Sequence, residues 1–353
     1  MNDQIRGAAA GSAPVPLSIL DLAGVGAGST PRDALLSTTE LAVAAERLGY
    51  HRFWVAEHHG IPAVASASPP VLLAHLAAAT STIRLGSGGV MLPNHAPLAV
   101  AEQFGTLAAL HPGRIDLGLG RAPGSDQVTA FALRRHAGQD QSDDFPDRLT
   151  ELQHFLHADF PAGHPFARIH ATPTEPLPIW LLGSSDFSAR LAGRLGLPFA
   201  FAYHFAGAGG QTGAALDLYR ASFQPSAELA EPYSMIGVTA AAADTESEAR
   251  YQAAAGALSM LLLRSGRLRR TPTPQEAAEY PYTQAETDLV AAMQSTEVIG
   301  TADQVAEALR KLVDQFGVDE LMITTRVHGP AARLRSFQLI SEAFALAPVA
   351  ARI

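Results

Sequence analysis

The chain has 353 residues, of which 47% are hydrophobic and 17% charged, a composition typical of a compact globular protein and not of a disordered or fibrous one. Its net charge of −9, from 25 basic and 34 acidic residues, disfavours nucleic acid as a partner. The absence of cysteine excludes disulfides, thiolate metal sites and cysteine nucleophiles.

Residues 1–15 have the composition of a Gly/Ala/Ser tail and lack the apolar core of a secretion signal. No apolar run approaches the roughly 18 residues that a membrane span needs. We therefore expect a flexible N-terminal tail on a cytoplasmic protein that has no membrane partner. Residues 16–348 are then predicted to form one large domain.

From residue 16 onward, short apolar runs typical of strands alternate with stretches that have helical hydrophobic spacing. The predicted strands are 16–23, 51–56, 83–91, 115–119, 179–182, 199–203, 234–242 and 321–325. The predicted helices are 30–49, 68–80, 97–110, 187–196, 213–223, 244–265, 301–316 and 333–346. Strand–helix repeats with short links imply parallel strands and right-handed crossovers. Eight such units predict a single (β/α)8 barrel, the TIM-barrel class of α/β fold.

Two segments interrupt this repeat, and we expect both to be insertions at the face formed by the carboxyl ends of the strands. The first, 122–178, is polar and contains prolines, with one amphipathic piece at 145–155. The second, 267–296, is rich in Thr, Pro, Gln and Glu and carries Tyr280 and Tyr282. Because irregular connections of this length often close over a site, residues 267–293 of the second segment are predicted to be a mobile lid.

The stretch 115–121, Ile-Asp-Leu-Gly-Leu-Gly-Arg, is typical of a buried strand that ends in two glycines and a fixed positive charge. Arg121 then lies at the carboxyl end of a parallel strand, where such folds bind ligands, and Gly118 and Gly120 leave room for a flat or phosphorylated ligand. Pro123 stands where a dinucleotide fingerprint needs its third glycine, which disfavours a Rossmann turn. A solvated strand end or a salt-bridge partner is the alternative explanation of the arginine.

A second candidate for anion binding is the start of the helix after the fifth predicted strand. Ser184, Ser185 and Ser188 lie there, directly after Gly183. Free backbone N–H groups, the positive end of the helix dipole and hydroxyl groups together favour a phosphate, and Arg121 on the neighbouring strand can supply charge. One serine that only caps the helix is the simpler alternative.

At the end of the second predicted strand stand Glu57, His58 and His59. Adjacent residues of a strand point to opposite faces, so the two histidines do not form a metal site, and no metal is expected. A single inward histidine that donates or accepts a proton is favoured over one that only packs at the rim. The pair Gly88 and Gly89 in the third strand is consistent with a bulge or with close packing.

Four motifs in the same order resemble those of the flavin-dependent luciferase-like monooxygenases, the family of bacterial luciferase. They are Trp-Val-Ala-Glu-His-His at 54–59, Gly-Ser-Gly-Gly-Val-Met-Leu-Pro at 86–93, His-Pro-Gly-Arg-Ile-Asp-Leu-Gly-Leu-Gly-Arg at 111–121 and Val-Ile-Gly-Thr at 298–301. The resemblance extends over about 17–346. It implies a barrel that binds FMN at the carboxyl ends of its strands.

The resemblance also implies roles for particular residues. His58 matches the active-site histidine of the family, and Gly88-Gly89 match the position of a non-prolyl cis peptide under the flavin ring. The residues at phosphate-binding positions are Arg121, Ser184, Ser185 and Ser188. Gly120, beside this arginine, replaces a reactive cysteine of the light-emitting luciferase subunit, and Ser184 replaces a glutamate. Light emission and a long-chain aldehyde substrate are therefore disfavoured.

The function implied by the resemblance is that of a two-component, FMN-dependent monooxygenase. It would take reduced FMN from a separate flavin reductase and use molecular oxygen on a small organic substrate that no motif identifies. Hydride transfer with the deazaflavin F420 on the same fold is one alternative, and a flavin-binding protein without turnover is another. Relatives pair through the second and third barrel helices, so a homodimer is expected. The apolar stripe of 97–110 is equally explained by packing on the core.

Overall fold

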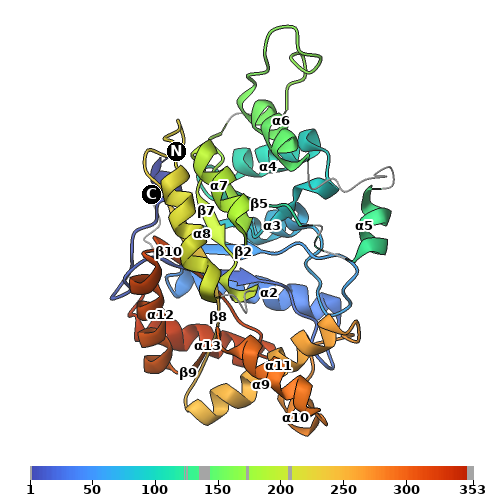
Figure 1. Cartoon of the computed structure of the whole chain (residues 1–353), viewed down its shortest axis with the longest axis vertical. Coiled ribbons are helices and arrows are strands. Elements are labelled where there is room, and N and C mark those ends of the chain that lie inside the picture. The colour runs from blue at the N-terminus through green and yellow to red at the C-terminus, as the bar shows by residue number, and fades with distance from the viewer. Residues whose placement is uncertain are drawn as a thin grey trace.

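The computed structural model describes residues 2–122, 124, 126–134, 144–171, 175–205 and 209–347. Within these ranges eight parallel strands form a closed barrel, which confirms the predicted TIM-barrel class (Figure 1). In spatial order the barrel strands are β10 (Glu320–Thr324), β1 (Leu17–Asp21), β2 (Arg52–Val55), β3 (Arg84–Ser87), β5 (Ile115–Gly120), β6 (Ile179–Gly183), β7 (Phe199–Phe201) and β8 (Ser234–Ala243). The ring closes because β10 pairs with both β1 and β8.

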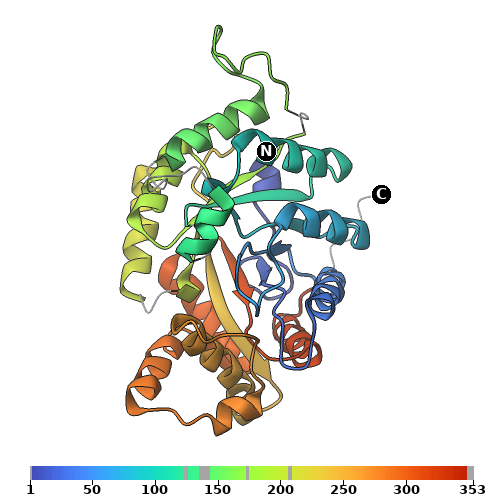
Figure 2. The ribbon, with the colours of Figure 1, turned by 90° about the vertical axis from the view of Figure 1, so that its right-hand side faces the viewer.

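Helices surround this barrel on its outside (Figure 2). They are α2 (Pro31–Arg47), α3 (Pro69–Ala79), α4 (Pro97–Leu110), α6 (Phe145–His157), α7 (Asp186–Leu195), α8 (Gly209–Ser222), α12 (Ala302–Phe316) and α13 (Pro330–Ala343). Local signals set their ends: Thr30 caps α2 by accepting from Asp33 N, and Gly317 ends α12 with a left-handed φ of 58°. No helix of the described residues is long and apolar enough to cross a membrane.

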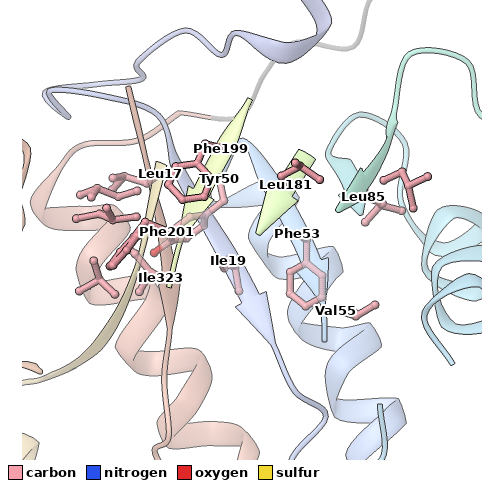
Figure 3. Close-up of a cluster of buried hydrophobic side chains, with 14 of the residues drawn as sticks. Leu17, Ile19, Tyr50, Phe53, Val55, Leu85, Leu181, Phe199, Phe201 and Ile323 are labelled. Carbon is pink, nitrogen blue, oxygen red and sulfur yellow. The ribbon is translucent and has the colours of Figure 1, made fainter. Parts of the chain in front are cut away.

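The main core lies between the strands and the helices (Figure 3). Alternate residues of each strand point outward into it, as Ile19, Phe53 and Ile323 do, and all three are fully buried. Each such side chain contributes about 1.5 to 3 kcal/mol by leaving water. The residues between them point into the barrel, where Trp54 and Trp180 meet edge to face at 5.3 Å.

At the amino-terminal end, the barrel interior holds a buried network of charges. The guanidinium of Arg52 lies 2.8 Å from Asp116 and 3.0 Å from Glu320, and its carbon is 4.9 Å from the ring centre of Trp180. Arg84 contacts the other oxygen of Asp116 at 2.5 Å. Two arginines thus face two carboxylates, so the buried charges balance, and removing one partner would leave a charge unpaired.

The N-terminal segment covers this network, which corrects the expectation of a flexible tail at 1–15. The side chain of Ile5, at the end of α1 (Asn2–Ile5), is fully buried, and its carbonyl accepts a hydrogen bond from Arg52. Gly7 N donates to the hydroxyl of Tyr233, and Ser12 N donates to Phe344 O at 2.7 Å. Composition predicted a tail because the anchors are a few single residues in a Gly- and Ala-rich stretch.

The first predicted insertion, 122–178, contains two helices that have different places in the fold. The amphipathic piece at 145–155 is part of a helix, α6, which packs against α4 and buries Phe145, Leu149, Leu152 and Phe155. It therefore occupies the place of the barrel helix between β5 and β6. The short helix α5 (Gln127–Arg134) lies before it on the side of the carboxyl ends.

The second predicted insertion is helical, so the expectation of an irregular connection there is wrong. After the long helix α9 (Glu246–Arg264) come α10 (Pro274–Glu279) and α11 (Gln284–Gln294), each begun by a Thr-x-x-Glu capping box. These three helices form a lobe at one side of the barrel (Figures 1 and 2). Tyr280 and Tyr282 pack against each other and against α9, which explains why these rings are there.

Candidate active site

A cavity of about 500 Å³ opens among the carboxyl ends of the barrel strands, within the usual size range of small-molecule sites. Its lining brings together the eight residues to which a catalytic or cofactor-binding role was assigned: His58, Gly88, Gly89, Gly120, Arg121, Ser184, Ser185 and Ser188. Glu57, His59 and Gly118 do not line it. The loops that carry the eight lining residues follow β2, β3, β5 and β6, which are neighbours in the ring. Strand periodicity was therefore sufficient to collect them at one end of the fold.

One rim of the cavity is suited to an anion. The guanidinium carbon of Arg121 lies 4.4 Å from the ring centre of Phe187, and this arginine pairs with no carboxylate of the described residues. Ser185 is the N-cap of α7, yet its hydroxyl makes no capping hydrogen bond, so the simple capping alternative does not apply to it. The first-turn N–H groups of α7 and this free cation together match the requirements of a phosphate.

Glycines form the wall beside this rim. The predicted strand 83–91 is interrupted, because β3 ends at Ser87, the Gly88-Gly89 peptide is cis, and β4 (Val90–Met91) pairs with the upper part of β5. A Cβ atom at Gly88 would lie 2.7 Å from Leu20 Cδ1, and one at Gly89 would lie 2.9 Å from Gly118 O. At position 89 only glycine fits, because the contact is with backbone, and the lack of side chains at both positions leaves bare backbone beside the cavity.

His58 follows β2 and lines the cavity opposite α7. Its backbone N–H donates to Ser66 O at 3.0 Å, while its buried Nδ1 has no hydrogen-bond partner among the described residues. Burial lowers the pKa of His58, and the neighbouring Glu57 only partly offsets this effect. The imidazole is therefore neutral near pH 7 and can accept a proton.

Glu57 fixes the end of β2 to its surroundings. Its buried carboxylate lies 2.8 Å from both His59 Nε2 and His95 Nε2 and accepts a hydrogen bond from Met91 N. Burial raises the pKa of Glu57, but the hydrogen bonds from His95 and His59 outweigh burial, and the pKa lies below its usual value. No sequence pattern pointed to His95, which lies 38 positions from Glu57 on a different connection.

Three more polar residues line the cavity, His204, Arg326 and His328, and the sequence analysis did not identify them. His204, in the short helix η2 (Tyr203–Phe205) after β7, holds its Nδ1 3.1 Å from Gly237 O, so this nitrogen donates and Nε2 remains an acceptor. Burial and then Arg326 lower the pKa of His204 to about 4. Arg326 and His328 follow β10, and Arg326 pairs with Glu297 at 2.8 Å. The only available signal was their place just after predicted strands.

An α/β barrel with a cavity of this kind defines a class of ligand-binding enzyme folds but no single chemistry. Residues 15–320 match the family model described as luciferase-like monooxygenase. The chain therefore belongs to the luciferase-like monooxygenase family, as its motifs indicated. Membership places the protein among the oxidoreductases, with monooxygenases as its relatives.

Similar proteins cover nearly the whole chain. A protein of Escherichia coli (strain K12) named luciferase-like monooxygenase is 45% identical over 325 residues, which is 92% of this chain and 96% of that protein. The N-acetyl-S-alkylcysteine monooxygenase of Bacillus subtilis (strain 168) is 38% identical over 331 residues, 93% of this chain and 98% of that protein. Among solved structures, apo-MsnO8 is 39% identical with a TM-score of 0.86, covering 95% of this chain and 100% of that chain.

More distant structures share the fold and differ in cofactor. The oxygenating constituent of 3,6-diketocamphane monooxygenase from the CAM plasmid of Pseudomonas putida, solved in complex with FMN, has a TM-score of 0.68 at 19% identity and covers 94% of this chain and 98% of that chain. An F420-dependent secondary alcohol dehydrogenase, solved with an F420–acetone adduct, has a TM-score of 0.67 at 16% identity and covers 94% and 99%. The fold therefore accommodates both flavin and deazaflavin.

Proposed function

We propose that this protein is a two-component, FMN-dependent monooxygenase that takes reduced FMN from a separate flavin reductase and uses molecular oxygen on a small organic substrate. The observation that carries the proposal is a single cavity that combines an anion rim, a flat glycine wall and an unpartnered histidine. The full-length similarity to proteins named as monooxygenases supports this choice over F420, whose dependent enzymes are more distant.

The residues fit FMN in both of its parts. Arg121 and the start of α7, with Ser184, Ser185 and Ser188, would hold the phosphate, since a free guanidinium and unpaired N–H groups stabilise a dianion. The Gly88-Gly89 wall and Gly120 would let the ring system lie against backbone. Reduced FMN, when bound, supplies the electrons with which oxygen is activated.

His58 has the properties of the group that holds or moves a proton in this reaction. It is neutral because burial lowers its pKa, its Nδ1 has no partner among the described residues, and its backbone is fixed by Ser66. A neutral imidazole accepts a proton from a reacting group and can return it in a later step. Leu22, Met260 and Leu263 add an apolar lining that excludes water.

The test is reconstitution with each cofactor. The protein should bind FMN, and reduced FMN should consume oxygen faster with the protein than without it once a substrate is found. His58→Ala should retain FMN affinity and lose product formation, which a pure flavin-binding protein would not show. Stoichiometric reduction of a carbonyl compound by reduced F420, with no oxygen uptake from reduced FMN, would favour the alternative.

We also propose that the protein is a cytoplasmic homodimer that pairs through the outer faces of α3 and α4. The predicted stripe Val100, Phe104 and Leu107 faces the core, so it is not available for pairing. Val71 on α3 and Leu110 on α4 are instead exposed at 71% and 67%, so these two side chains are available for pairing. Light scattering after gel filtration should give twice the chain mass of 37.1 kDa, and Val71→Glu with Leu110→Glu should give monomers.

A further inference from the structure

Two sides of the cavity present different polar groups to a ligand. Arg121 follows β5, whereas Thr325 and His328 follow β10. In the closed ring, β10, β1, β2, β3 and β5 are successive strands, so β5 and β10 lie four positions apart in a ring of eight, on opposite sides. A cofactor held by its phosphate at the β5 side leaves the β10 side for a second ligand.

Polar atoms without partners are concentrated on this β10 side. Thr324 Oγ1, Thr325 Oγ1 and His328 Nε2 line the cavity, are buried, and have no hydrogen-bond partner among the described residues. Thr324 is only 2% exposed, so water does not readily replace a partner. Folded proteins leave few buried polar atoms unsatisfied, so three of them at the end of β10 and in the loop after it mark a place where a polar ligand can bind.

His328 is held so that one ring nitrogen remains available. A Cβ atom at Gly26 would lie 2.9 Å from His328 Nε2, so the loop after β1 passes directly beside the ring. Thr271 binds this loop through Thr271 N to Val25 O and Ala27 N to Thr271 O, both 2.8 Å. The ring also forms a hydrogen bond to the backbone of Ala27, whose carbonyl can only accept. Since Nε2 has no partner, the other ring nitrogen carries the proton, and Nε2 of the neutral imidazole is an acceptor.

The surroundings of these atoms are largely apolar, and the arginines that line this side of the cavity are already paired with carboxylates. Leu263 and Leu268 line the cavity from α9 and the segment that follows it. Both arginines nearby are engaged, because Arg326 pairs with Glu297 at 2.8 Å and Arg333 pairs with Asp21 at 2.9 Å. A carboxylate ligand would therefore find no free cation here, whereas an apolar molecule with an N–H or O–H group would satisfy His328.

We propose that Thr324, Thr325 and His328, with Gly26 opposite, form the subsite for the organic substrate, and that it selects an uncharged molecule with an apolar body and a hydrogen-bond donor that His328 Nε2 accepts. This assignment rests on the proposed function, because it takes the β5 side as the flavin side. His328 is then a specificity-determining residue.

Matched probes test the donor requirement without a turnover assay. FMN-loaded protein is titrated with hexanamide and N,N-dimethylhexanamide, and with hexan-1-ol and 1-methoxyhexane, and binding is followed by the change in flavin absorbance. The donor of each pair should bind about tenfold more tightly than its capped partner, as expected when a buried acceptor is left unpaired. In His328→Phe this preference should fall to within about twofold, while the FMN dissociation constant is unchanged.

A second variant protects the test against a folding defect at His328. Gly26→Ala places a methyl group against Nε2 and should abolish the preference with His328 intact, whereas Gly24→Ala adds the same methyl where the nearest atom is 3.9 Å away and should retain it. Equal binding of both members of each pair by the wild type, or a preference that persists in both His328→Phe and Gly26→Ala, would overturn the subsite. Wild-type protein that does not bind FMN would instead refute the proposed function, and the subsite with it.

Discussion

Replacing Arg121 with alanine should weaken FMN binding far more than riboflavin binding. The guanidinium stacks on Phe187 at 4.4 Å, pairs with no carboxylate of the described residues, and lies on the same cavity rim as the start of α7. A charge-assisted hydrogen bond to a phosphate contributes about 1.5 to 3 kcal/mol, which corresponds to roughly 10- to 150-fold in the dissociation constant. Riboflavin has no phosphate, so its affinity should change by less than about threefold.

Fluorescence quenching of each flavin, titrated at low and at physiological ionic strength, measures both constants. In the wild type, the affinity difference between FMN and riboflavin should shrink at higher ionic strength, because salt screens the charge of Arg121. Arg190→Ala is the matched control, because it removes an exposed arginine of α7, the helix whose start lies on the same rim as Arg121. It should leave both dissociation constants near the wild-type values. If both flavins lost the same factor in Arg121→Ala, the phosphate would have to lie elsewhere.

Deletion of residues 1–7 should lower the free energy of unfolding by at least about 2 kcal/mol, because Ile5 leaves the core and Arg52 loses an acceptor; an unchanged urea midpoint would contradict this. The pKa of His204 is about 4 in the folded protein and 6.5 for a free imidazole. The unfolded protein therefore binds the proton first as the pH falls, and the free energy of unfolding should drop by roughly 3 kcal/mol between pH 6.5 and pH 4. Urea titrations at both pH values should show a smaller loss in His204→Gln than in the wild type. If 267–293 is a lid, FMN with a bound probe should slow the proteolysis of this segment, whereas equal cleavage rates with and without ligands would show that it does not close.

The sequence predicted the barrel and its rim because both follow from short-range periodicity. Once the strands were placed, Arg121, His58 and Ser185 had to meet at the carboxyl ends, and the structure lines one cavity with them. Contacts between distant segments could not be foreseen in this way. Glu57 and His95 meet only after the crossover through α3, and His328 lies beside Gly26, which precedes it by 302 positions, in a space that a side chain at Gly26 would occupy.

Other errors were failures to use signals that were present. The Thr-x-x-Glu pattern occurs twice in the second insertion, and each occurrence begins a helix. Its composition, rich in Thr, Pro, Gln and Glu, suggested an irregular connection, although Pro274 stands at the first helical position after Thr273, where proline is favoured. The packing of Ile5 had no such signal, since a single apolar residue in a small-residue stretch has no periodicity.

The strand β8 has a consequence for how this protein can be rebuilt. Its last residues, Ala240 to Ala243, continue beyond the barrel and pair in parallel with β9 (Val298–Thr301), so the chain leaves and re-enters on one two-stranded ribbon. The helices between these two strands, α9 to α11, are therefore connected to the rest of the chain at two points that lie close together. Exchanging this lobe for one from a relative alters the closure entropy only slowly with length, so it is the natural crossover segment for chimaeras.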